Sequence, residues 1–183
     1  MAEFPRAGAV RTLHSPAAIA ARIAELASAI VADYRDRPPV VVSILKGSFV
    51  FAADLVRALA LPVRIEFLGV QSYGSGTAST GAVQITQDLT HPVEGQEILI
   101  VEDIVDTGLT LAYILSLIKA RGARSVKVCA LLDKPSRRRV AVPVDYVGFT
   151  IGEAFVVGYG LDCAEQYRNL PGLCELLDVP AGS

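Results

Sequence analysis

Residues 98–111 read ILIVEDIVDTGLTL, an aliphatic run that leads into acidic residues and an Asp-Thr-Gly turn. The run predicts a strand over 97–101 that is buried on both faces, and the apolar spacing after the turn predicts a helix over 107–121. In an open parallel sheet, ligands bind beyond the carboxyl ends of the strands, and the free N–H groups at a helix start favour phosphate. Gly108 lets an anion approach the backbone, and Thr107 and Thr110 add hydroxyl donors.

Three carboxylates, Glu102, Asp103 and Asp106, fall within five residues of this stretch. Like charges so close together are costly unless a ligand needs them. A vicinal diol is one such ligand, because its two hydroxyls can donate to two adjacent carboxylates. A phosphate site beside a diol site describes a ribose 5-phosphate. The alternative is structural, since an acidic strand end often leads into a capped helix, here with Asp106 or Thr107 as N-cap.

Apolar runs and helical spacing alternate along the rest of the chain. One helix begins at Ser15-Pro16, with Ser15 as N-cap, and another follows Gly47. Further strands are expected over residues 40–45, 63–70, 83–86, 126–132, 142–149 and 155–159. The repeated strand–helix–strand order predicts an α/β fold with an open, mostly parallel sheet flanked by helices. No interdomain linker is visible, so we expect a single domain over 1–183.

The composition excludes several classes of protein. Of the 183 residues, 52% are hydrophobic and 20% are charged, and the net charge is -2. Neither a disordered chain nor a nucleic-acid-coating protein is therefore expected. The sequence has no P-loop, and its glycines at 74, 76 and 81 lack the spacing of a dinucleotide-binding turn. Three cysteines without a C-x-x-C pair, no export signal and no membrane-length apolar run indicate a cytoplasmic protein.

A set of motifs resembles those of the type I phosphoribosyltransferases, and more narrowly of the hypoxanthine (hypoxanthine-guanine) phosphoribosyltransferases. In the family's order they are Leu45-Lys46-Gly47-Ser48, Ser72-Tyr73-Gly74, VEDIVDTGLT at 101–110, Leu132-Asp133-Lys134-Pro135, FVVGYGLD at 155–162 and YRNLP at 167–171. The resemblance implies the family's fold, with a small hood formed by the N-terminal and C-terminal segments. It also implies a closing lid over residues 72–82, with Ser72 and Tyr73 as its signature. The three glycines and the absence of charge in that stretch are typical of a flexible loop.

The resemblance assigns residues to the donor, phosphoribosyl pyrophosphate. Glu102 and Asp103 would hold the ribose hydroxyls. The loop that would hold the 5-phosphate consists of Asp106, Thr107, Gly108, Leu109 and Thr110. Leu109 departs from the polar or basic residue that is common there, so only its backbone is expected to contact phosphate. Asp106 is also the family's candidate acid/base at purine N7, because the incoming base must lose a proton as its nitrogen attacks the anomeric carbon.

The pyrophosphate and the metal involve other positions. Lys46, Gly47 and Arg168 would bind pyrophosphate, with a cis peptide bond before Lys46 or Gly47. Mg²⁺ is the implied cofactor, held by Asp162 and by the acidic pair Glu102 and Asp103 together with substrate phosphate oxygens. Taken alone, Lys46 and Arg168 also fit ordinary solvated side chains. No zinc site is expected, since the sequence has no cluster of His and Cys.

The purine would lie against Lys134, Phe155, Val156 and Asp162. A lysine only donates hydrogen bonds, so Lys134 favours a 6-oxopurine over adenine. Phe155 would stack on the base, and the backbone of Val156 would read its edge. The structural alternative is that Lys134 caps a strand and Phe155 belongs to the core.

These assignments imply transfer of 5-phosphoribosyl to hypoxanthine, and to guanine, in a homodimer or homotetramer. The alternatives are a regulator on the same fold that senses phosphoribosyl pyrophosphate and binds nucleic acid, and a transferase that acts on xanthine. The net charge of -2 and the absence of an added DNA-binding segment weigh against the regulator. The basic run Arg137-Arg138-Arg139 is typical of a solvated turn, or of a patch that attracts an anionic substrate.

Overall fold

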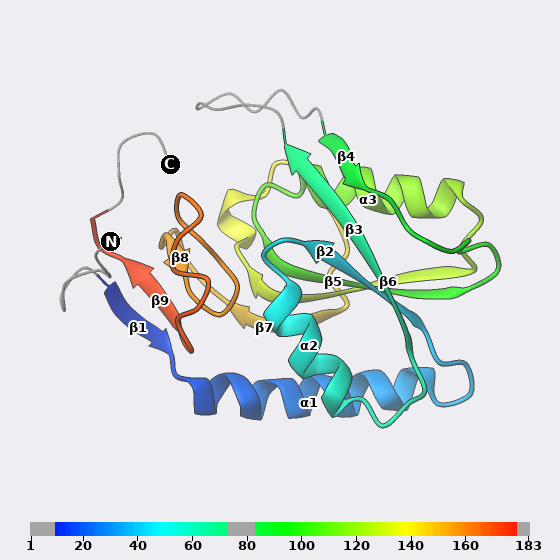
Figure 1. Ribbon diagram of the computed structural model, residues 1–183, viewed down its shortest axis with the longest axis horizontal. Helices are drawn as coiled ribbons and strands as arrows, with labels where there is room; N and C mark the ends of the chain where they lie inside the picture. Colours follow the sequence, from blue (N-terminus) through cyan, green and yellow to red (C-terminus); the bar gives the residue numbers. More distant parts are fainter. Residues whose placement is uncertain (1–9, 73–82, 179–183) are drawn as a thin grey trace.

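Six strands form the main sheet of the computed structural model, which describes residues 10–72 and 83–178 (Figure 1). In spatial order they are β4 (Val83–Gln87), β3 (Arg64–Ser72), β2 (Val40–Leu45), β5 (Glu97–Val105), β6 (Ser125–Asp133) and β7 (Tyr146–Thr150). Every neighbouring pair is parallel except β3 with the edge strand β4. The expected open, mostly parallel sheet is confirmed. The chain order reverses between β2 and β5, and ligands bind at the carboxyl ends of strands at such a switch point.

Helices cover both faces of this sheet. The helices α1 (Pro16–Tyr34) and α2 (Phe49–Ala58) lie on one face, and α3 (Leu109–Ala120) lies on the other (Figure 1). Each face has its own cluster of buried apolar side chains. Successive residues of β2 alternate between them, because Val41 belongs to the α1 and α2 cluster whereas Val42 belongs to the α3 cluster. This alternation explains why β2 reads as a continuous apolar run.

Local signals place the helix ends. Ser15 caps α1, since its hydroxyl accepts a hydrogen bond from the N–H of Ala18 at 3.2 Å. The apolar positions predicted for α3 are all buried: Leu111, Ile114, Leu115 and Ile118. The helix expected over 107–121 begins later, at Leu109, because Gly108 is its N-cap and lies in the left-handed region at φ 83°. None of the helices within residues 10–72 and 83–178 combines the length and apolar character needed to cross a lipid bilayer.

Some strands differ in extent from the sequence prediction. β5 continues past residue 101 to Val105, because Glu102, Ile104 and Val105 stay paired with β6. The strand expected over 142–149 begins only at Tyr146, since Pro143 has no N–H to donate to a neighbouring strand. The strand expected over 155–159 shrinks to β8 (Val156–Val157).

A second, three-stranded sheet joins the two ends of the described chain. Its order is β1 (Val10–His14), β9 (Leu173–Leu176) and β8, with antiparallel pairing throughout. Figure 1 shows it beside the sheet that carries the switch point. The sequence did not predict β1, since a strand this short is stabilised by its partner in the sheet rather than by its own pattern.

Candidate active site

A cavity of about 720 Å³ opens at the carboxyl ends of β2 and β5, at the switch point. It brings together six of the residues singled out from the sequence: Lys46, Gly47, Glu102, Asp103, Asp162 and Arg168. Gly69, Val70 and Gln71 of β3 and Thr86 and Gln87 of β4 line its other side. Residues more than 100 positions apart in the chain therefore share one pocket.

The turn after β2 fits closely against β5. The peptide bond between Leu45 and Lys46 is cis. The buried Ser48 hydroxyl donates to the carbonyl oxygen of Ile44 at 2.6 Å, which fastens the turn. A Cβ added at Gly47 would lie 1.5 Å from Oδ2 of Asp103, so no side chain can stand at this position without displacing that carboxylate. Glycine is therefore needed at position 47 because Asp103, which is distant in the sequence, lies against it.

Burial acts on both members of the acidic pair Glu102 and Asp103. Oε2 of Glu102 is buried and has no hydrogen-bond partner among the described residues. Burial and the neighbouring Asp103 raise the pKa of Glu102 well above its ordinary value. Burial likewise raises the pKa of Asp103 to about 6, although its Oδ1 accepts a hydrogen bond from the N–H of Ile104 at 2.8 Å. Two such carboxylates are suited to accept hydrogen bonds from hydroxyl groups or to bind a cation.

The two cations of the cavity are held by acids. Arg168 contacts Asp162, with 2.8 Å between Nη2 and Oδ1, and Nη1 donates to the carbonyl oxygen of Gly160 at 2.9 Å. Nζ of Lys46 lies 3.1 Å from Oε2 of Glu165. The other oxygen of Glu165 lies 3.6 Å from Nη2 of Arg168.

Glu165 was missed by the sequence analysis. It has a left-handed backbone at φ 62° and a side chain that is 69% exposed, both within a tight turn. An exposed acid in a turn carries no signal of its own. Only the fold shows that it lies between the two cations expected to bind pyrophosphate.

The loop after β5 is shaped by the segment that follows β6. The hydroxyl of Thr107 accepts a hydrogen bond from the N–H of Leu109 at 3.4 Å, at the start of α3. A Cβ on Gly108 would lie 2.5 Å from the carbonyl oxygen of Val140 and 3.0 Å from Cδ of Arg138. The glycine is therefore required by its left-handed backbone and by this close approach, in addition to any ligand. Thr110 and Leu109 are partly buried in the first turn of α3.

Asp106 lies at the end of β5 and is held from the same segment. Its Oδ1 accepts a hydrogen bond from Nε of Arg137 at 2.8 Å. Its carbonyl oxygen accepts one from Nη1 of Arg138 at 3.1 Å. Neither arginine was assigned a place in the site by the sequence analysis. The two alternatives offered there, a solvated turn or a general attraction for anions, do not describe these contacts.

Of the residues expected to contact the purine, Lys134 lies beside this loop, because its N–H donates to the carbonyl oxygen of Val105 at 3.0 Å. Lys134 is only 7% exposed, and its Nζ donates to the carbonyl oxygen of Ala154 at 2.8 Å. Burial lowers its pKa, while Asp106 opposes that shift. Phe155 is partly buried and packs against the cluster that contains Val157 and Cys163.

The cavity lining does not include every expected site residue. Residues 106–110, Lys134, Phe155 and Val156 are outside the lining of the 720 Å³ cavity. Val156 is buried and is paired with Glu175 in the smaller sheet. Ser72 ends β3 opposite Val83, and the rest of the expected lid, residues 73–82, lies outside the described residues. Strand β5 connects the cavity to the loop of residues 106–110, since it carries Glu102 and Asp103 and leads directly to Asp106.

The chain was compared with known proteins. Residues 9–164 match the phosphoribosyl transferase domain family. The chain is 46% identical over 161 residues to the hypoxanthine-guanine phosphoribosyltransferase of Bacillus subtilis, covering 88% of this chain and 89% of that protein. It is 51% identical over 150 residues to the bifunctional protein TilS/HprT of Listeria innocua; the match covers 82% of this chain and spans 23% of that longer relative.

Solved structures agree with these matches. The crystal structure of a hypoxanthine phosphoribosyltransferase from Staphylococcus aureus superposes with a TM-score of 0.88 at 43% identity, over 91% of this chain and 90% of that one. The fold, the family match and the relatives point in the same direction as the motifs. The chain belongs to the hypoxanthine phosphoribosyltransferase group of the phosphoribosyl transferase family.

Proposed function

We propose that this protein transfers 5-phosphoribosyl from phosphoribosyl pyrophosphate to hypoxanthine, and to guanine, in purine salvage, releasing pyrophosphate and IMP or GMP. The observation that carries the proposal is the pocket in which the adjacent acids Glu102 and Asp103 lie beside the cations Lys46 and Arg168. Carboxylates accept hydrogen bonds from the hydroxyls of a ribose, and cations bind the pyrophosphate attached to that ribose. The choice of hypoxanthine and guanine as the purine substrates follows the names of the relatives.

The reaction breaks the bond between the anomeric carbon and pyrophosphate, and forms a bond from that carbon to purine N9. Asp106 accepts the proton that the base gives up at N7. Glu102 and Asp103 hold the ribose hydroxyls, and their charge favours a transition state with cationic character at the ring. Thr107, with the N–H groups of residues 108–110, holds the 5-phosphate at the start of α3.

The departing pyrophosphate is bound by the backbone of the Lys46-Gly47 turn and by Arg168. The guanidinium of Arg168 can hold two phosphate oxygens at once. To bind them, the side chain of Arg168 must exchange its contacts with Asp162 and Glu165 for the ligand. Both cations are already in the pocket, so this exchange needs no movement of the main sheet.

The base is read by the segments after β6 and before β8. Lys134 donates to the oxygen at purine C6, Phe155 stacks on the ring, and the Val156 backbone contacts its edge. The buried Nζ of Lys134 already donates to a backbone oxygen, that of Ala154. A C6 oxygen offers the same kind of acceptor, whereas the amino group of adenine does not.

The site also fits Mg²⁺. Among the described residues, no three His, Cys, Asp or Glu side chains form a ligand set on their own. Mg²⁺, however, takes one or two carboxylates together with substrate phosphates and water. Asp162, Glu102 and Asp103 line the same pocket, where Oε2 of Glu102 has no hydrogen-bond partner among residues 10–72 and 83–178. When bound, the ion would neutralise charge on the pyrophosphate as it departs.

Steady-state assays test the proposal. The protein is mixed with phosphoribosyl pyrophosphate, Mg²⁺ and, in turn, hypoxanthine, guanine, xanthine or adenine, and nucleotide formation is measured. We expect turnover with hypoxanthine and guanine and none with adenine. Turnover with xanthine alone would correct the base assignment. No turnover with any base, together with a gel shift on nucleic acid, would support the regulator in place of the enzyme.

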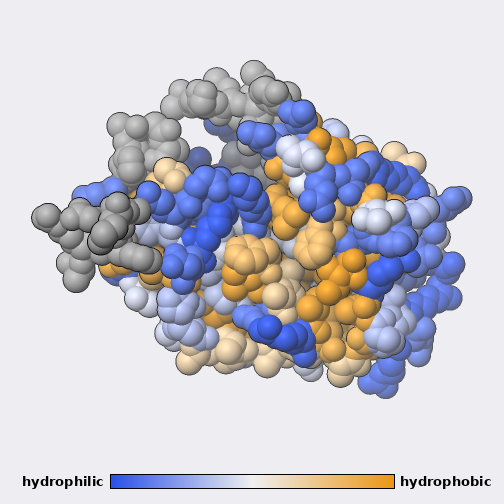
Figure 2. All heavy atoms as spheres, viewed as in Figure 1, coloured by the Kyte–Doolittle hydropathy of each residue, from blue (hydrophilic) through white to orange (hydrophobic). Residues whose placement is uncertain are grey.

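The proposal includes assembly into a homodimer or homotetramer. Phe49, Ile65 and Phe67 are 46%, 41% and 42% exposed and line one shallow apolar pocket on α2 and β3. Figure 2 shows apolar atoms gathered on this face. A second copy would remove this surface from water. Sedimentation of the parent and of Phe67→Glu tests this: we expect the variant to dissociate, and a monomeric parent would contradict the proposal.

The proposal also covers the surroundings of the site. The sheet of β1, β9 and β8 serves as the hood, because Phe155, on the segment that enters β8, is the expected stacking residue. A cytoplasmic location is supported by three free, buried cysteines, Cys129, Cys163 and Cys174, which suit a reducing compartment.

A further inference from the structure

The three arginines that follow β6 make different contacts, although they are consecutive in the sequence. Arg137 reaches the carboxylate of Asp106, with 2.8 Å between Nε and Oδ1. Arg138 donates to the backbone carbonyl of Asp106 at 3.1 Å and also pairs with Asp133. Arg139 is exposed, and no side-chain hydrogen bond or ion pair of it is found among the described residues. A patch that merely attracts anions would not require each arginine to have different contacts.

The backbone of the same segment braces the phosphate loop. The N–H groups of Arg139 and Val140 donate to the carbonyl oxygen of Thr107 at 2.9 and 3.1 Å. The ion pair of Arg138 with Asp133 is partly buried, since the two side chains are 16% and 15% exposed. It ties the segment to the end of β6. The segment of residues 137–140 therefore has a fixed place from which the side chain of Arg137 can act.

We propose that Arg137 is a positioning residue for Asp106. Its guanidinium holds one oxygen of the Asp106 carboxylate, so that the other oxygen faces the N7 proton of the purine. The inference rests on the proposed role of Asp106. A carboxylate on a short side chain rotates about its last bond, and one bound oxygen restricts that rotation. The guanidinium remains charged and keeps a fixed geometry, which suits it to orient a carboxylate.

The exposure of the Arg137–Asp106 ion pair indicates whether loss of Arg137 should affect stability or catalysis. The side chains of Arg137 and Asp106 are 48% and 35% exposed. An ion pair so open to water adds little to folding stability. Its value lies in orientation, because a reacting group that is misplaced by about 1 Å can cost up to roughly 100-fold in rate. Loss of Arg137 should therefore slow the chemical step while the protein stays folded.

The test compares Arg137→Ala and Arg137→Lys with the matched control Arg139→Ala. The readout is the single-turnover rate of IMP formation from phosphoribosyl pyrophosphate, Mg²⁺ and hypoxanthine. We expect Arg137→Ala to lower this rate by about 3- to 30-fold, with the dissociation constant of phosphoribosyl pyrophosphate changed by less than about twofold. Arg137→Lys should recover part of the rate. Arg139→Ala removes only the exposed side chain and keeps the backbone N–H that donates to Thr107, so it should match the parent.

A double-mutant cycle separates positioning from a general structural role. In an Asp106→Asn background, Arg137→Ala should cause no further loss, because the arginine acts through the carboxylate. An equal loss in both backgrounds would overturn the inference. So would a parental rate in Arg137→Ala, or a loss confined to donor binding.

The outcome can be separated from failure of the proposed function. A parent protein without transferase activity would refute the function assigned above, whereas an Asp106→Asn variant with the parental rate would refute only the proposed role of Asp106. An active parent, an impaired Asp106→Asn and an unimpaired Arg137→Ala would refute only the role of Arg137.

Discussion

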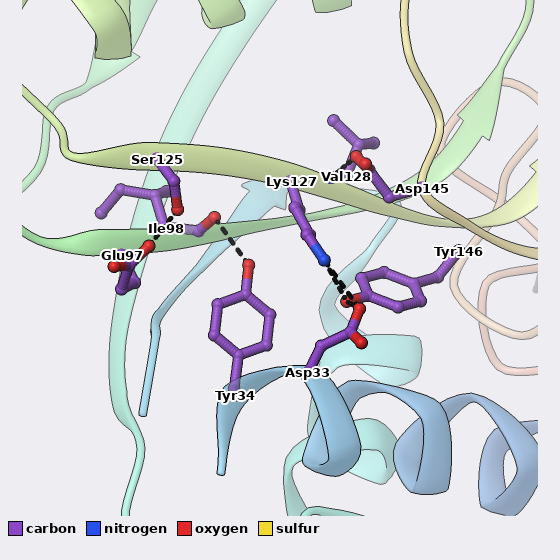
Figure 3. A network of polar contacts seen from close by, with 9 residues as sticks. All are labelled: Asp33, Tyr34, Glu97, Ile98, Ser125, Lys127, Val128, Asp145 and Tyr146. Carbon is purple, nitrogen blue, oxygen red and sulfur yellow. Dashed lines mark hydrogen bonds and ion pairs between the residues drawn. The ribbon is translucent and has the colours of Figure 1, made fainter. Parts of the chain in front are cut away.

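The two ends of the main sheet differ in how completely their acids are paired. At the amino end, Lys127 of β6 lies 2.7 Å from Oδ2 of Asp33, and the hydroxyl of Tyr146 donates to the same oxygen at 2.6 Å (Figure 3). Tyr34 reaches the carbonyl of Ile98 at 3.4 Å in the same network. At the carboxyl end, Oε2 of Glu102 is buried without a partner among the described residues. The network at the amino end therefore satisfies its polar groups internally, whereas one buried oxygen at the carboxyl end is left without a partner in the described part of the chain.

The pKa shifts of one acid at each end, Asp33 and Asp103, have opposite signs. Hydrogen bonds from Lys127 and Tyr146 lower the pKa of Asp33, and the hydrogen bond to Asp33 raises that of Lys127. Burial instead raises the pKa of Asp103 to about 6. The network at the amino end stabilises the fold, whereas the acids at the carboxyl end destabilise the folded protein until a ligand arrives. Functional sites commonly carry such costs.

The largest effect should come from Asp106→Asn at the carboxyl end. The variant keeps the shape of the side chain but cannot take up the proton, so turnover should fall by about 10²- to 10⁴-fold. Binding of phosphoribosyl pyrophosphate, measured by calorimetry, should change far less. Parental turnover would remove Asp106 as the acid/base.

Replacing one lysine at each end sharpens the comparison. Lys134→Met removes the donor to the C6 oxygen and should lower kcat/KM for hypoxanthine by about 10- to 100-fold. Lys127→Met, the matched control at the amino end, should leave kcat/KM unchanged and lower only the free energy of unfolding. Similar kinetics for the two variants would show that Lys134 does not read the base.

Replacing one acid at each end should change stability in opposite directions. Glu102→Gln removes a buried charge, so the free energy of unfolding without ligand at pH 8 should rise by about 1 kcal/mol. Asp33→Asn weakens an exposed network and should lower it by about 0.5 kcal/mol. Urea unfolding measures both values. Destabilisation by Glu102→Gln would mean that the carboxylate finds a compensating partner in the ligand-free protein.

The smallest effect is in the pH dependence of unfolding. Asp103 has a folded pKa of about 6, above its unfolded value of about 3.9, so the folded state binds the proton more tightly. Its contribution to stability should be lost as pH rises from about 4 through 6. Asp103→Asn should flatten this slope relative to the parent, and an unchanged slope would contradict the assigned shift.

Asp33 should behave in the opposite way. Its folded pKa lies below the ordinary value, so its contribution is present above about pH 4 and is lost as pH falls through the lowered value. The destabilisation caused by Asp33→Asn should therefore shrink toward pH 3. A constant difference between variant and parent over this range would show that the network does not depend on the carboxylate charge.

The sequence by itself determined the fold class and most strands of the main sheet, and it located two adjacent acids at the end of a buried strand. The strand β2 has the predicted bounds, Val40–Leu45, because an uninterrupted aliphatic run is a strong local signal. The start of α1 followed from Ser15 and Pro16 for the same reason. Glu102 and Asp103 were recognisable because adjacent carboxylates at the end of a buried strand are costly without a ligand.

Only the tertiary structure decided which charges meet and which stay without partners. Glu165 pairs with Lys46 across 119 positions, Arg137 with Asp106 across 31, and Lys127 with Asp33 across 94. The strand β1 likewise depends on β9, which lies at the other end of the chain. Periodicity and caps act over a few neighbouring residues, whereas an ion pair or a strand pair depends on distance in space, which arises only when the chain has folded.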